Sequence, residues 1–174
     1  MEFRRGEGNQ LGELVWWLTP DWRFSDDTFK NVLLTPTNFS ANAPFQNNWN
    51  LGQHAASYSP DGNYIIMFDN QNGFGTGLFY NQGGASRVWV VQINREAKTV
   101  TQIHEWRPPG PPSLDYLMGN AYFLPSGDIL SGWPVRREVY ETTMPGGDIR
   151  FSVRFEPAEN KTYIYRALKV PLYD

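Results

Sequence analysis

His54 is the residue whose type and position in the sequence could do chemistry. It lies near the start of segment 53–66, which returns at 118–130 with Gly119 in place of the histidine. A neutral imidazole is a competent nucleophile, and a covalent intermediate on it divides one difficult displacement into two easier ones. The alternative is a buried histidine whose ring is hydrogen-bonded to the backbone. Both interpretations stay open at this point.

The repeat around His54 predicts the fold that must position it. Each copy reads as a short strand, a Pro-x-Gly turn and an apolar strand, and a second hairpin follows, at 87–106 and 138–155. Four antiparallel strands per unit, repeated, are typical of a β-propeller blade. We therefore predict an all-β fold with two complete blades, 53–106 and 119–155. A Gly/Asn-rich insertion at 69–85 interrupts the first blade.

Segments flanking the two units predict a single partial propeller over residues 1–174. A strand at 13–18 has no visible partner and opens the long segment 11–50, and 163–170 reads as one final strand. Propellers typically close with 4–8 blades. We therefore expect either a piece of a larger ring or an assembly of several copies. Open blade faces and strand edges predict self-association.

Composition limits the classes of partner. Hydrophobic residues make up 40% and aromatic residues 16%, which indicates a globular rather than a disordered chain. The net charge of −3 gives no general attraction to nucleic acid. No apolar run approaches the roughly 20 residues that span a membrane. Without cysteine, and with only two histidines far apart, no metal site is expected.

Short motifs carry a family resemblance over about residues 50–170. They are Gln53-His54-Ala55-Ala56, Phe68-Asp69-Asn70, Ser86-Arg87-Val88, 99–106, Gly119-Asn120-Ala121, 124–130 and Tyr165-Arg166-Ala167. In this order they resemble the motifs of bacterial arylsulfate sulfotransferases. The resemblance implies a six-bladed propeller with its active site in the central channel, and an exported or periplasmic parent protein. Segment 1–10 lacks the apolar stretch of a secretory signal, so the compartment is left open.

The resemblance also implies a chemistry for His54. In that family, the histidine of a Gln-His-x-Ala motif takes a sulfuryl group from an aryl sulfate and passes it to a phenol, without a metal or diffusible cofactor. An upstream family blade with a His-x-Asn-Ser motif has no counterpart in this sequence. We therefore expect the chain to correspond to the C-terminal part of such an enzyme, with doubtful activity on its own.

Three further residues are candidates for binding the sulfate group: Arg87, Asn120 and Arg166. Alignment of the repeats places Asn120 and Arg166 one position after the histidine, on strands predicted to line the channel. An amide and a guanidinium both suit a sulfate oxyanion. The alternatives are that Arg166 pairs with a carboxylate and that Arg87 anchors the glycine-rich loop before it.

Two functions therefore remain for the whole chain. The first is an arylsulfate sulfotransferase-like protein with His54 as the covalent acceptor. The second is a non-catalytic interaction or carbohydrate-binding module, since exposed tryptophan and tyrosine rings stack well on sugars. In a fold rich in blades, however, most aromatic rings belong to the core. Only the first function depends on His54.

Overall fold

The computed structural model describes residues 2–4, 13–18, 30–39, 49–50, 52–71, 85–156 and 163–170. These residues form β-strands, connecting turns and one 3-10 turn, and no α-helix occurs among them. The all-β prediction is therefore confirmed. Most of the insertion at 69–85, and much of 11–50, lies outside the described residues.

The first sheet contains the four strands predicted for the first unit, and it gains a fifth. Its members are β4 (Gln53–Tyr58), β5 (Tyr64–Asp69), β6 (Arg87–Asn94), β7 (Thr99–Trp106) and β3 (Thr35–Pro36). The strand order is β3-β7-β6-β5-β4, in which β3 alone pairs in parallel, with β7. The other strands pair with antiparallel neighbours; short turns join β4 to β5 and β6 to β7, and the longer segment 70–86 joins β5 to β6.

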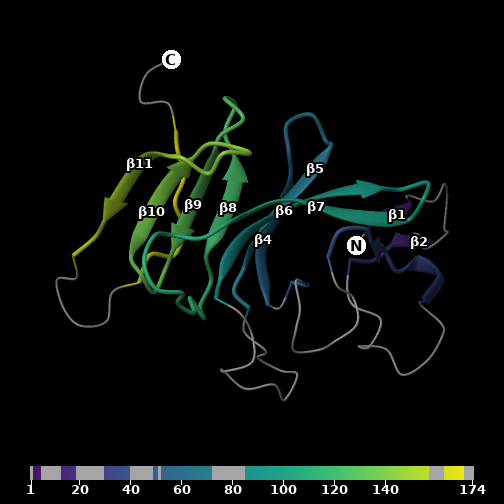
Figure 1. The fold of residues 1–174 in the computed structure, drawn as a ribbon, viewed down its shortest axis with the longest axis horizontal. Coiled ribbons are helices and arrows are strands. Elements are labelled where there is room, and N and C mark those ends of the chain that lie inside the picture. The colour runs from purple at the N-terminus through teal and green to yellow at the C-terminus, as the bar shows by residue number, and fades with distance from the viewer. Residues whose placement is uncertain are drawn as a thin grey trace.

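The second sheet contains the four strands of the second unit, in the order β11-β10-β9-β8. They are β8 (Asn120–Phe123), β9 (Ile129–Trp133), β10 (Glu138–Thr142) and β11 (Ile149–Arg154). Figure 1 shows the two sheets side by side, and the edge strand β4 of the first contacts the edge strand β8 of the second. The sheets are consistent with propeller-like blades, and the described residues form no closed ring.

The sequence of strand β5 is a continuous apolar run rather than an alternation of apolar and polar residues. Ile65 and Met67 pack on one face of the first sheet, while Ile66 and Phe68 pack on the other face, toward the second sheet. A strand that is buried on both faces has no polar side. The cluster between the sheets contains Ile66, Phe68, Val88, Val90, Trp106, Ala121, Ile129, Trp133 and Tyr140.

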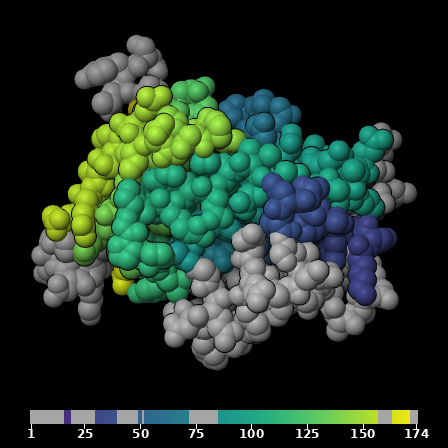
Figure 2. Space-filling model, in the orientation of Figure 1, coloured from purple at the N-terminus to yellow at the C-terminus, as the bar shows by residue number. Residues whose placement is uncertain are grey.

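The described residues within 11–50 form strand pairings that the sequence did not predict. The expected orphan strand, β2 (Glu13–Trp16), pairs antiparallel with β1 (Glu2–Arg4), so the prediction of a strand without an upstream partner is wrong. Backbone pairing needs no apolar side chains, which is why the short polar β1 left no signal in the sequence. The 3-10 turn η2 (Lys30–Val32) leads into β3. In Figure 2 the blue residues 30–39 lie beside the teal residues of the first sheet.

The predicted final strand at 163–170, the C-terminal segment, is also wrong as a strand. Its Ala167 bonds a side chain instead of a neighbouring backbone: Asn120 Nδ2 donates to Ala167 O and Ala167 N donates to Asn120 Oδ1, both at 2.9 Å. Ile164 and Ala167 pack beside Leu124, Leu130 and Val139. The C-terminal segment therefore covers the face of the second sheet that is turned away from the first.

Candidate active site

His54 is the second residue of β4, paired with Phe68 of β5, and its side chain is exposed. Directly after it the ladder is irregular between His54 and Ser57, and Ala55 has a φ of 52°. Positive φ is uncommon for a residue with a Cβ. Irregularities of this kind re-aim side chains and are frequent beside active sites. The edge position and the irregularity together present the imidazole to solvent.

The hydrogen bonds of His54 determine where its proton lies. Nδ1 is 2.6 Å from Asn70 Oδ1 and 3.2 Å from the carbonyl oxygen of Gly52. A carbonyl oxygen can only accept, so Nδ1 carries the hydrogen in the neutral ring. The other nitrogen, Nε2, then has a free lone pair. This arrangement is what a nucleophilic imidazole requires.

Arg87 is buried, with 1% of its side chain exposed, and its guanidinium bonds protein groups at the end of the first sheet. Nε donates to Asp69 Oδ2 at 3.0 Å, and Nη1 donates to Glu105 Oε2 at 2.7 Å. Nη2 donates to the carbonyl oxygen of Trp49 at 3.1 Å, and the guanidinium lies over the ring of Trp89. These contacts direct the guanidinium toward the protein rather than toward solvent.

The two arginines that contact Glu105 lower its pKa. Burial works to raise the pKa of Glu105, but the charges and hydrogen bonds of Arg87 and Arg107 outweigh it and hold that pKa below its ordinary value. Glu105 therefore stays ionised and links one buried and one exposed arginine. This cluster fastens β7 to β6 at the end of the sheet.

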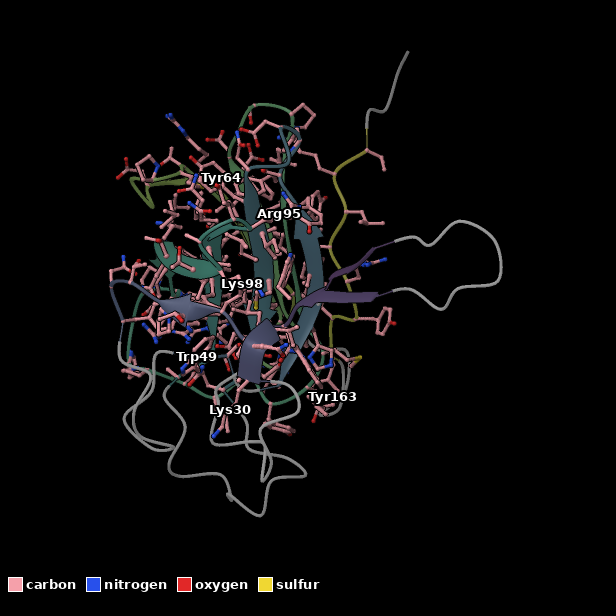
Figure 3. The ribbon with its side chains drawn as sticks, turned by 90° about the vertical axis from the view of Figure 1, so that its right-hand side faces the viewer. Lys30, Trp49, Tyr64, Arg95, Lys98 and Tyr163 are labelled. Atoms are coloured by element: carbon pink, nitrogen blue, oxygen red, sulfur yellow. The ribbon has the colours of Figure 1, made fainter. Side chains whose placement is uncertain are left out.

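The Arg87 cluster and His54 lie at the same end of the first sheet. Figure 3 shows Trp49 and Tyr64 toward opposite ends of the molecule, and Trp49 is the residue that Arg87 bonds. Strand β4 begins at this end, because Gln53 pairs with Asp69. The buried ion pair thus supports the part of the sheet from which His54 projects.

Asn120 and Arg166 lie in other surroundings. Asn120 is buried, and both polar atoms of its amide bond the C-terminal segment. Arg166 is exposed and lines a hollow of about 610 Å³ between the C-terminal segment, β10 and β11. That hollow is on the outer side of the second sheet, whereas His54 is on β4. The structure therefore does not gather the four predicted site residues into one cluster.

Asn70 contacts His54 in this site, and it is not among the site residues predicted from the sequence. It directly follows β5 and is fully buried. The signal was present, since Phe68-Asp69-Asn70 is one of the motifs that carry the family resemblance. What could not be read from the sequence is that its amide reaches the imidazole of His54.

Two features are absent from the described residues: a cluster of metal ligands and a membrane-spanning helix. Across the part of the chain that the structure describes, no three histidine, aspartate or glutamate side chains gather as metal ligands would. No described helix has the length and apolar character needed to cross a bilayer.

Comparison with known families decides the relationship. A sequence model of the family described as Arylsulfotransferase (ASST) matches residues 8–166, which is most of the chain. The chain belongs to the arylsulfotransferase family. The resemblance read from the ordered motifs is thereby confirmed, and the family suggests aryl sulfates and phenols as substrates. Among curated proteins, no match to this arylsulfotransferase chain was found.

Proposed function

We propose that this arylsulfotransferase transfers a sulfuryl group from an aryl sulfate to a phenol through a sulfohistidine on His54. In the first step the Nε2 lone pair bonds sulfur, the bond from sulfur to the aryl oxygen breaks, and a phenolate leaves with the electron pair. In the second step an acceptor phenol loses its proton to hydroxide, and its oxygen attacks the same sulfur. The nitrogen–sulfur bond breaks and its electron pair returns to Nε2.

One observation carries the proposal: His54 is exposed while its Nδ1 faces two acceptor oxygens. A histidine in the core would lack solvent access, so that a substrate could not reach its Nε2. The other histidine, His104, provides the contrast, because its Nε2 is buried and has no hydrogen-bond partner. Burial also lowers the pKa of His104, against the charge of Glu105. Of the two, only His54 can meet a substrate.

The test is the intact mass of the purified chain after brief mixing with an aryl sulfate at alkaline pH. The expected result is a gain of one sulfuryl group in the wild type and in His104→Gln, and no gain in His54→Ala. Circular dichroism of each variant checks that the fold is retained. An adduct that persists in His54→Ala would refute His54 as the acceptor.

A second candidate function is a non-catalytic interaction or carbohydrate-binding module. Exposed apolar side chains favour it, among them Phe151, Phe155, Tyr165 and Leu168. Three of these line the hollow beside β11: Phe151, Phe155 and Leu168. A large apolar patch on a soluble protein typically marks an interaction surface. Binding of a partner or a sugar that survives His54→Ala, together with no sulfuryl adduct in the wild type, would support this function instead.

A further inference from the structure

Asn70 has every polar atom of its side chain committed. Its Nδ2 donates to the carbonyl oxygens of Asp115 at 2.5 Å and Met118 at 2.9 Å, and its Oδ1 lies 2.6 Å from Nδ1 of His54. An amide nitrogen can donate twice and accept nothing. Because two carbonyl oxygens face the nitrogen, the amide cannot turn over without placing oxygen against oxygen. The oxygen of Asn70 is therefore fixed toward His54.

We infer that Asn70 is a positioning residue, which holds His54 in the form with hydrogen on Nδ1 and the lone pair on Nε2. A free histidine side chain in water favours the opposite form, with hydrogen on Nε2. The short bond to Asn70 reverses this preference, and the longer contact to Gly52 supports it. This inference rests on the proposed function only for its consequence in catalysis. The orientation of the imidazole is a separate, measurable property.

The segment that holds Asn70 lies between the sheets in sequence and is fastened to the second sheet. Asp115, whose carbonyl oxygen accepts from Asn70, is fully buried, and its carboxylate accepts from the backbone N–H groups of Val135 at 2.8 Å and Arg136 at 3.1 Å. Those residues form the turn between β9 and β10. A chain of hydrogen bonds therefore runs from that turn, through Asp115 and Asn70, to the imidazole of His54.

Ser86, directly before β6 of the first sheet, connects the backbones of Asn70 and Asp115. Its hydroxyl donates to the carbonyl oxygen of Asn70 at 2.8 Å and accepts from the N–H of Asp115 at 2.7 Å. The surrounding backbone is constrained as well, because Ala55, Gln71 and Met118 all have positive φ. Strained backbone persists only where the surroundings over-determine it, and it clusters at functional sites. Residues flanking His54 and Asn70, and the acceptor Met118, all show it.

The experiment measures the proton position directly, by long-range ¹H–¹⁵N correlation of the imidazole rings at alkaline pH, where the rings are neutral. The chain has two histidines, so His104→Gln assigns the signals of His54. In the wild type we expect Nδ1 to be protonated and Nε2 unprotonated. In Asn70→Leu, which cannot accept, we expect the signals to move toward the Nε2–H form. The rate of sulfuryl uptake should fall about 10–100-fold, the loss that is typical when the partner orienting a metal-binding histidine is removed.

Asn38→Ala is the matched control. The amide of Asn38 also bonds backbone twice, donating to Gln102 O at 2.8 Å and accepting from Gln102 N at 2.9 Å. It lies next to β3, at the opposite edge of the same sheet from His54. Loss of these two bonds should change neither the ring signals of His54 nor the uptake rate.

A wild-type spectrum with hydrogen on Nε2 would overturn the inference without any variant, so it stays testable if Asn70→Leu does not fold. Unchanged signals in a folded Asn70→Leu would overturn it too, because Gly52 alone would then be sufficient. A wild type with the expected signals but no sulfuryl adduct would refute the proposed function and leave the positioning role intact.

Discussion

Replacing Arg87 with methionine removes the cation that two carboxylates share at the end of the first sheet. Arg87 donates to Asp69, which is fully buried, and to Glu105, which is 22% exposed. It also donates to the carbonyl oxygen of Trp49. Methionine has a similar length and no charge, so the variant tests the electrostatic role while it keeps most of the packing.

The magnitude follows from burial. Removal of one partner of a buried ion pair leaves an uncompensated charge and costs about 3–5 kcal/mol. Asp69 would keep two hydrogen bonds from Gln71, which offset part of this cost. With a urea dependence of roughly 2 kcal/mol per molar, a loss of about 4 kcal/mol lowers the unfolding midpoint by about 2 M. Single domains are stable by about 5–15 kcal/mol, so this is a large fraction of the total.

Urea unfolding followed by tryptophan fluorescence is the assay, and Arg107→Met is the control. Arg107 pairs with the same Glu105, but 37% of its side chain is exposed, so its loss should cost only about 0–1 kcal/mol. Equal midpoint shifts in the two variants would refute the argument from burial. A stable Arg87→Met that has lost sulfuryl uptake would instead support the substrate contact predicted from the sequence.

Three further predictions concern single side chains. A Cβ at Gly119 would overlap the ring of Phe68, and φ there is +97°, so Gly119→Ala should lose about 2–4 kcal/mol in urea unfolding. Gly127→Ala, with φ +87° and open space, should lose only about 1 kcal/mol. Asn120→Ala should cost about 1–3 kcal/mol and make the C-terminal segment exchange amide hydrogens faster. The pKa of Glu105 in the folded protein lies below its ordinary value of 4.5. The stabilisation that ionised Glu105 contributes through Arg87 and Arg107 is therefore present above about pH 4.5 and is lost as the pH falls further. Glu105→Gln should lose less stability than the wild type as the pH falls from about 5 to about 3.

The strands of both sheets could be predicted because their signals are local. The hairpin predicted at 87–106 is formed by β6 and β7, which begin and end at these limits. Apolar runs bounded by turn residues report strands without knowledge of their neighbours. Strand β3 gave no such signal, since two residues in parallel contact with β7 carry no periodicity.

The C-terminal segment shows where a local signal misleads. Its residues have high strand propensity, and propensity measures how well side chains fit a pleated surface rather than whether a backbone partner exists. In the structure the amide of Asn120 takes the place of that partner. An amide suits a sulfate oxyanion, which is why Asn120 is predicted to bind the substrate; a backbone group that lacks a bond, such as those of Ala167, leaves no mark in the sequence.

His54 could be proposed from its sequence motif, whereas its contact with Asn70 could not be read from the sequence, and the reason is physical. Asn70 acts through backbone carbonyl groups 45 and 48 residues further along the chain, and every residue type carries such a group. Asn120 acts in the same way on Ala167, 47 residues further along. Each asparagine thus ties one sheet to the segment that follows it. The orientation of His54 is therefore a property of the junction between the two sheets rather than of β4 alone, and changes in the second sheet should reach the imidazole without touching it.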